Sequence, residues 1–198
     1  METLFQLAQK RRSCYHLTHQ STLSDEQLLD LVHEAVLYAP SPFNSQSTRV
    51  LLLLNRSHTK FWELVKKELA KIIPPEKFAS TEEKINSFAA AYGTILFFED
   101  WQIVENLQAQ FPTYKENFPL WAYQANAMAE YLIWTALAEQ GMGASLQHYN
   151  PLIDAAVQQT FQTPASWKLI AQMPFGVKGG EPEAKTFFPI EERVKVFS

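Results

Sequence analysis

The stretch LSDEQLLDLVHEAVLYAPSPFNSQSTRVLLLL, residues 23–54, decides the fold, because it joins a capped amphipathic helix to a polar loop and a strand. Ser24 followed by Gln27 has capping-box spacing, and apolar residues then recur at helical intervals. Pro40 ends this helix, since proline lacks the backbone N–H that a helix interior requires. The apolar run after the loop is short and continuous, which predicts a buried strand over residues 49–54.

The rest of the chain alternates helical and strand patterns. GTILFFED (residues 93–100) and WKLIAQMPFG (167–176) are predicted as strands, and GASLQHYN (143–150) as a short strand and loop. Helices are predicted at residues 2–10, 58–71, 80–92 (Ser80 and Glu83 as a capping box), 121–140 and 151–161 (Pro151 in the first turn).

Residues 121–140 are apolar on nearly every side, so this helix is expected to be central or to lie in a subunit interface, with Gly141 ending it. Residues 176–197 have no helical period until their end and are expected to follow a surface. Strands separated by helices indicate one layered α and β domain over residues 1–198.

The composition of the chain argues against several classes of protein. The net charge is −4 with no long basic run, which argues against binding nucleic acid through phosphate neutralisation. The longest uninterrupted apolar run, at residues 50–54, is too short to span a bilayer, and the N-terminus does not resemble a signal peptide. The single Cys14 excludes an internal disulfide, so a cytoplasmic protein is expected.

Standard catalytic signatures are missing. The sequence has no GxGxxG, GxxxxGK[ST], GxSxG or HExxH motif, and its five histidines lack regular metal-ligand spacing, so no metal site is predicted. Cys14 follows two arginines that would lower the pKa of a thiol, but a small buried thiol is the favoured interpretation.

Three polar clusters favour one flat, phosphorylated ligand. Arg11, Arg12 and Ser13 suit a phosphate, although cations also occur simply at helix C-termini. Asn44 and Gln46 carry donors and acceptors that match an imide edge, although the same residues make ordinary turns.

In the third cluster, Gly141 and Gly143 would let backbone approach something flat, and Gln147, His148 and Tyr149 follow them; a helix cap and a turn are the alternative. Lys178 and Lys185 add cations near the C-terminus. A phosphate, a flat apolar ring system and an imide edge together describe FMN.

At this point the sequence resembles the nitroreductase family of FMN-dependent oxidoreductases, and within it the short subgroup of fatty-acid-repression-mutant proteins and bacterial stress-induced nitroreductases. The resemblance is carried by RRSCY (residues 11–15), APSPFNSQSTRV (39–50), GMGASLQHYNP (141–151) and AQMPFGVKGGEPEAK (171–185). It implies an α+β, three-layer α/β/α fold that forms an intertwined homodimer, with two FMN sites at the interface and the two ends of one flavin held by different chains.

The resemblance also implies roles for individual residues. Arg11, Arg12 and Ser13 would contact the FMN phosphate and ribityl chain, with Lys185 and Lys178 as further cations. Asn44 would meet the pyrimidine edge of the flavin, near Gln46, Ser41 and Phe43, while Gln147 and His148 would supply a backbone N–H to flavin N5. Tyr15 stands where many members have a cation near flavin N1, which predicts a lower reduction potential.

The predicted reaction is ping-pong hydride transfer, in which NADH or NADPH reduces the flavin and a nitroaromatic, quinone or similar small molecule reoxidises it. Phe43 and Trp121 are candidates for stacking on this acceptor, and no side chain is required as an acid or base. Two alternatives stay open: a flavin-binding stress or regulatory protein with incidental turnover, and a helical interaction protein without flavin.

Overall fold

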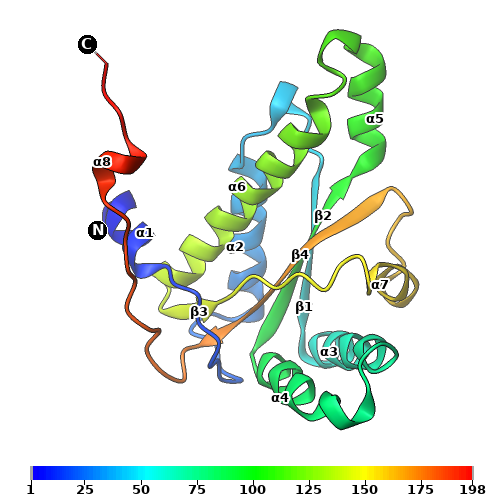
Figure 1. The fold of residues 1–198 in the computed structure, drawn as a ribbon, viewed down its shortest axis with the longest axis vertical. Coiled ribbons are helices and arrows are strands. Elements are labelled where there is room, and N and C mark those ends of the chain that lie inside the picture. The colour runs from blue at the N-terminus through cyan, green and yellow to red at the C-terminus, as the bar shows by residue number, and fades with distance from the viewer. Residues whose placement is uncertain (1, 198) are drawn as a thin grey trace.

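The computed structural model describes residues 2–197, which form one four-stranded antiparallel sheet with helices on both faces (Figure 1). Across the sheet the strands are β1 (Thr48–Leu54), β2 (Gly93–Asp100), β4 (Trp167–Val177) and β3 (Met142–Ala144). One face is covered by α2 (Asp25–Tyr38) and α6 (Phe118–Glu139), and the other by α3 (Asn55–Ala70), α4 (Phe78–Ala89) and α7 (Asp154–Phe161). The predicted α+β class and its three layers are therefore confirmed.

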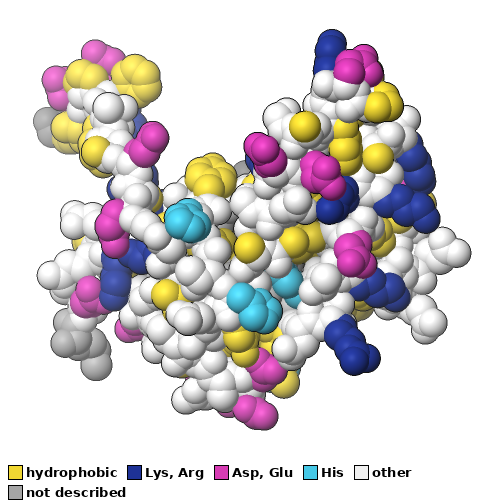
Figure 2. Space-filling view, turned by 90° about the horizontal axis from the view of Figure 1, so that it is seen from below, with side chains coloured by type: hydrophobic (Ala, Val, Ile, Leu, Met, Phe, Trp, Pro, Cys, Tyr) yellow, Lys and Arg dark blue, Asp and Glu magenta, His cyan; other side chains and the backbone are white. Residues whose placement is uncertain are grey.

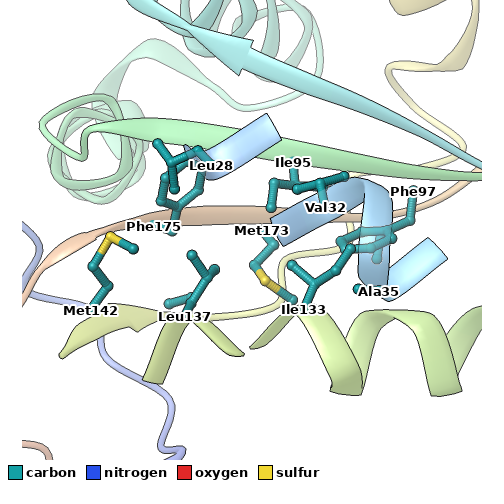
Figure 3. Close-up of a cluster of buried hydrophobic side chains, with 12 residues drawn as sticks. Leu28, Val32, Ala35, Ile95, Phe97, Ile133, Leu137, Met142, Met173 and Phe175 are labelled. Carbon is teal, nitrogen blue, oxygen red and sulfur yellow. The ribbon is translucent and has the colours of Figure 1, made fainter. Parts of the chain in front are cut away.

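Two hydrophobic cores lie on opposite faces of the sheet, because successive side chains of a strand alternate in direction. In β2, Ile95 and Phe97 face α2 and α6, whereas Leu96 and Phe98 face α3, α4 and α7. Figure 3 shows the first core, where side chains of α2, α6, β2 and β4 meet. Because both faces are covered, the central strands are mostly apolar, as the sequence indicated.

The best-marked helix forms as predicted. The Ser24 Oγ accepts a hydrogen bond from the Gln27 N–H at 3.3 Å, and the Gln27 Oε1 accepts one from the Ser24 N–H at 2.9 Å. Gly141 follows α6 with a φ of 80°, the left-handed conformation that ends a helix and that glycine adopts without strain. The predicted start of α2 and the predicted end of α6 are both confirmed.

Two predicted start signals are wrong, and α3 and α6 each begin three residues before the predicted positions 58 and 121. α4 begins at Phe78 and not at Ser80, because the short 3-10 turn η2 (Pro75–Lys77) leads directly into it, and it has no side-chain cap. Pro151 does not lie in the first turn of α7. It lies in the preceding turn, where its carbonyl oxygen accepts a hydrogen bond from the Asp154 N–H at 3.2 Å.

Three short elements lie outside the layers or at the chain ends. Helix α5 (Trp101–Gln110) was not predicted; with η3 (Pro112–Tyr114) it projects from the sheet between β2 and α6 (Figure 1). Helices α1 (Leu4–Lys10) and α8 (Ile190–Arg193) lie on the same side of the molecule as the two chain ends. Within residues 2–197, no helix combines the length and apolarity needed to cross a membrane.

Candidate functional site

The N-terminal motif lies against the sheet as an added strand. Ser13 pairs with Ala144 of β3, and the Cys14 N–H donates to the Ala144 carbonyl oxygen at 2.9 Å. Leu17 pairs with Lys178, just beyond β4. The structure thus brings residues 11–13 beside residues 141–145, although about 130 positions of sequence separate them.

Four candidate cofactor residues line two neighbouring cavities at this seam. Arg12 and Lys185 line a cavity of about 620 Å³ between α1 and residues 184–187. Arg12, Ser13 and Tyr15 line a second cavity, of about 520 Å³, against residues 180–184. The Arg12 guanidinium also donates to the Glu183 carbonyl oxygen, so it ties the C-terminal segment to the motif.

Arg11 and Lys178 have other partners. The Arg11 guanidinium lies 4.2 Å from the centroid of the Trp134 ring on α6, a cation–π contact, and points away from Arg12 as neighbours in extended backbone do. The Lys178 Nζ lies 3.5 Å from the Glu181 carboxylate, and this ion pair partly neutralises the positive charge of Lys178. Of the predicted phosphate cations, Arg12 and Lys185 are thus the two that share a cavity.

The glycines serve the protein's own packing. A Cβ at Gly143 would lie 2.8 Å from the Cβ of Cys14 and 2.8 Å from the Cγ of Lys178, so glycine is needed to seat the N-terminal strand. Gly141 has nothing within 4 Å of that position and acts as the helix end. Of the two predicted uses, the helix cap is confirmed at Gly141, and the close approach of backbone to a flat ligand stays a prediction. Burial raises the pKa of the Cys14 thiol, partly offset by the Lys178 charge, which excludes a reactive thiolate.

The backbone N–H groups of residues 147–150 alternate between paired and free, and those of His148 and Asn150 have no acceptor among residues 2–197. The Gln147 N–H donates to the Gln172 carbonyl oxygen at 2.7 Å, and the Tyr149 N–H to the Gln172 Oε1 at 2.8 Å. His148 between them is exposed, and its backbone N–H has no acceptor among residues 2–197. The Gln147 side chain is buried and donates to the Ser145 Oγ at 3.1 Å, so its amide is engaged within the protein.

The loop of residues 41–46, called the amide loop below, carries the second set of candidates. Asn44 and Gln46 are exposed, and Ser41 lies at the base of the loop, where its Oγ accepts the Gln46 N–H at 2.9 Å. Phe43, Asn44 and Gln46 all have left-handed backbone, with φ of 54°, 52° and 49°. Such residues persist only where surrounding structure holds them, and they cluster at functional sites.

Side chains that the sequence analysis missed hold the end of this loop and the start of β1, which follows it. The Glu99 Oε1, fully buried at the end of β2, accepts from the Thr48 Oγ1 at 2.6 Å and from the Asn126 Nδ2 of α6 at 2.9 Å. The Arg49 guanidinium donates to the Gln46 carbonyl oxygen at 2.6 Å and pairs with Asp100 at 3.2 Å. The one sequence signal was an acidic pair directly after a buried apolar run.

Aromatic side chains gather beside the amide loop and form what we call the aromatic box. The half-exposed Phe43 ring stacks near Trp121 with centroids 6.4 Å apart and an interplanar angle of 25°, so the two predicted acceptor residues do meet. The rings of Phe111 and Phe118 lie 4.7 and 5.4 Å from that of Phe43. Tyr114 completes the group at 6.0 Å. The aromatic density of FPTYKENFPLW was the signal for these additions.

The two sets of candidates lie far apart along α6. The amide loop packs near Trp121 at the start of this helix, and Arg11 packs on Trp134 near its end. A rise of 1.5 Å per residue separates these two tryptophans by about 20 Å. On the face drawn in Figure 2, acidic and basic side chains are interspersed.

Comparisons with known proteins agree with this architecture. Residues 8–177 match the model of the nitroreductase family. The chain is 32% identical to nitroreductase FRM2 of Saccharomyces cerevisiae over 179 residues, which cover 89% of each protein.

Solved structures give the same result. Nitroreductase CinD from Lactococcus lactis in complex with chloramphenicol is 41% identical, with a TM-score of 0.91 over 99% of this chain and all of that one. A nitroreductase with bound FMN from Desulfitobacterium hafniense shares the fold, with a TM-score of 0.71, at 16% identity over the whole of both chains.

A sheet covered on both faces, with a basic N-terminal strand seated on it, defines an α+β fold that the solved nitroreductases share. The chain belongs to the nitroreductase family and is an enzyme of that family.

Proposed function

We propose that this enzyme is FMN-dependent and uses NADH or NADPH to reduce nitroaromatics, quinones or related small acceptors. When bound, FMN would supply the redox chemistry, taking a hydride at N5 from the nicotinamide and reducing the acceptor that replaces it. The chain's own residues then have three tasks: to bind the phosphate, to orient the ring system, and to admit a flat acceptor while excluding bulk water.

Arg12, Ser13 and Lys185 would hold the phosphate. The cavity that Arg12 shares with Lys185 has two cations and no carboxylate among its lining residues, which suits a dianion. Tyr15 and Ser13 lie in the adjoining cavity, within reach of a polyol chain. Arg11 and Lys178 would act at longer range, since each already has a partner.

The flat ring would lie between a backbone donor and side-chain amides. The His148 N–H is unpaired within the described chain and exposed, as a donor to flavin N5 must be. Asn44 and Gln46 carry both donors and acceptors, which an imide edge requires. The residues present therefore fit the group.

The aromatic box would receive the acceptor. Phe43 and Trp121 offer apolar faces at the edge of the amide loop, and aromatic rings stack with about 0.5–1.5 kcal/mol beyond their burial. CinD has been solved with 4-nitrophenol as well as with chloramphenicol, both nitroaromatic compounds, and its structures resemble this one closely.

A homodimer would unite the two sets of residues. Because about 20 Å of α6 separates the amide loop from Arg11, one copy would bind the phosphate end and its partner the pyrimidine edge. Apolar side chains of α6 that stay exposed in the single chain would be covered: Leu120, Met128, Tyr131 and Leu132. The C-terminal segment stands out with its own apolar side chains uncovered (Figure 2), and β1 has a sheet neighbour on one side only.

The observation that carries the proposal is the cavity that Arg12 and Lys185 share, which has two cations and no carboxylate among its lining residues. The test is to add FMN to the purified protein, remove the excess, and measure visible absorbance, mass by light scattering, and NAD(P)H oxidation with a nitroaromatic. We expect a yellow dimer with kcat of about 1–1000 s⁻¹. Colourless protein would refute the proposal, and yellow protein with far slower turnover would favour the regulatory role.

Arg12→Ala is the matching variant, because it removes a charge-assisted contact to the phosphate and leaves the sheet intact. We expect the dissociation constant for FMN to rise about 30-fold. Lys77→Ala, in η2 on the far layer, is the control and should leave this constant unchanged. An unchanged constant for Arg12→Ala would remove Arg12 from the site.

A further inference from the structure

One buried residue of β4 makes all the polar contacts that fix the 147–150 segment to the sheet. The Gln172 N–H donates to the Gln147 carbonyl oxygen at 2.9 Å, and its carbonyl oxygen accepts the Gln147 N–H at 2.7 Å. Its side chain continues the pairing: Oε1 accepts the Tyr149 N–H at 2.8 Å, and Nε2 donates to the Asn150 Oδ1 at 3.2 Å. Gln172 thus holds the segment on both sides of His148.

The position of Gln172 makes an amide there unexpected on packing grounds alone. It lies opposite Leu96 of β2, so its side chain points to the same face, where Leu96, Phe98 and Leu169 belong to an apolar core. The side chain is completely buried, and burying an amide costs stability unless every polar atom is paired. An apolar residue would fill this face but would leave the Tyr149 N–H without its acceptor.

The pairing leaves the His148 N–H free between two peptide units that are fixed. Both flanking N–H groups are used by Gln172, whereas that of His148 has no acceptor in the described chain. A backbone donor can be aimed only by fixing the peptide units around it. The hydrogen bonds from Gln172 do so on either side.

We propose that Gln172 is a positioning residue that aims the His148 N–H at N5 of the bound flavin. This inference rests on the function proposed above. Oxidised N5 is a bare acceptor, whereas reduced N5 carries a hydrogen, so an aimed N–H stabilises the oxidised form selectively. Loosening the segment should therefore raise the midpoint potential of the flavin and weaken the binding of oxidised FMN.

The test compares Gln172→Met, which keeps length and burial but removes both polar atoms, with Tyr92→Phe. Tyr92→Phe removes a single side-chain hydrogen bond, to Asp25 at 2.6 Å, and neither residue belongs to the proposed site. We expect both variants to lower the melting temperature. Only Gln172→Met should raise the midpoint potential and raise the FMN dissociation constant about tenfold.

Amide hydrogen exchange of the apoprotein gives a readout independent of turnover. In the wild type the Tyr149 amide should exchange slowly and the His148 amide fast, and FMN should slow His148. In Gln172→Met the Tyr149 amide should become fast. Asn150→Ala, which removes only the Nε2 contact, should shift the potential in the same direction by less, and it carries the test should Gln172→Met not fold.

Two results would overturn the inference while leaving the proposed function intact. One is FMN-loaded Gln172→Met, or Asn150→Ala where Gln172→Met does not fold, with unchanged potential and affinity. The other is a wild-type His148 amide whose exchange FMN does not slow. Failure of the wild-type protein to bind FMN would refute the proposed function itself and this inference with it.

Discussion

The amide loop and the 147–150 segment would serve the same ligand but are built in opposite ways. The loop offers side chains from left-handed, strained backbone. Arg49 binds the Gln46 carbonyl oxygen, and Glu99, paired with Asn126, binds Thr48 just beyond the loop. The segment offers a backbone N–H from extended chain paired with β4. The first kind of donor can be recognised from residue types, whereas the second depends on which N–H groups the fold leaves unpaired.

The comparison also separates stability from binding. Strain in the amide loop opposes folding, so its support must come from buried side chains whose loss is costly. The segment has no such strain, and its pairing contributes to the sheet itself. Substitutions in the two regions should therefore differ in sign and in size.

The largest effect is expected at Glu99, the buried support of the amide loop. Glu99→Ala would leave the Thr48 hydroxyl and the Asn126 amide short of an acceptor and would open a cavity. The free energy of unfolding should fall by about 4 kcal/mol in urea titrations of the apoprotein. Glu99→Gln, which keeps one acceptor, should lose less. Equal losses for the two variants would contradict the hydrogen-bonding role.

A substitution at Glu130 tests the stability of α6, the helix whose start packs near the amide loop. Burial on α6 raises its pKa from the ordinary 4.5 to about 7, so the folded state favours the protonated form. Its contribution to stability is complete below pH 4.5 and is lost as the pH rises to 7. At pH 8, Glu130→Gln should therefore be more stable than the wild type by roughly 3 kcal/mol, and at pH 4.5 about equal to it. A difference that does not depend on pH would disprove this.

Gly143 tests the seam beside the 147–150 segment. Gly143→Ala would place a methyl group 2.8 Å from Cys14 and Lys178 side-chain atoms, so the N-terminal strand must shift. Stability should fall by about 2 kcal/mol, measured by thermal or urea unfolding. Gly141→Ala would be a poor control, because the backbone at Gly141 is left-handed and alanine would be strained there. Gly180→Ala is the better control: the atom nearest to its added methyl group lies at 3.7 Å, so the stability should hardly change.

The smallest effect is expected at Gln46 and has the opposite sign. Gln46→Gly removes the strain of a left-handed side-chain residue, so the apoprotein should gain about 1 kcal/mol. The lost amide should nevertheless weaken FMN binding about tenfold. Ser45→Gly, at a position that is not left-handed, should give no such gain. A loss of stability in Gln46→Gly would show that the loop is not strained there.

Much of the fold was readable from local patterns. α2, β2 and the end of α6 follow from a capping box, a continuous apolar run and one glycine. α5 escaped because it begins directly after β2 without a side-chain cap and buries only Val104. Its weak pattern carried no start signal.

Candidate site residues could be predicted from the sequence only where the residue type itself indicates a binding role. Arg12, Asn44, Gln46 and Lys185 were candidates because cations and amides have recognisable chemistry. Glu99, Asn126 and Gln172 were missed because their roles arise from pairing across β2, α6 and β4, and a single sequence does not reveal these long-range contacts. The packing of Gly143 against Cys14 was missed for the same reason, although the burial of the Cys14 thiol was predicted.

The burial of Cys14 at this seam makes the opening rate of the N-terminal strand measurable. Cys14 is the single thiol of the chain, and it is shut beneath Gly143 and the end of β4. A thiol reagent can modify it only when the N-terminal strand lifts away, so the labelling rate measures that opening directly. One label per chain, followed by mass spectrometry, would thus time the motion of the strand without any engineered probe.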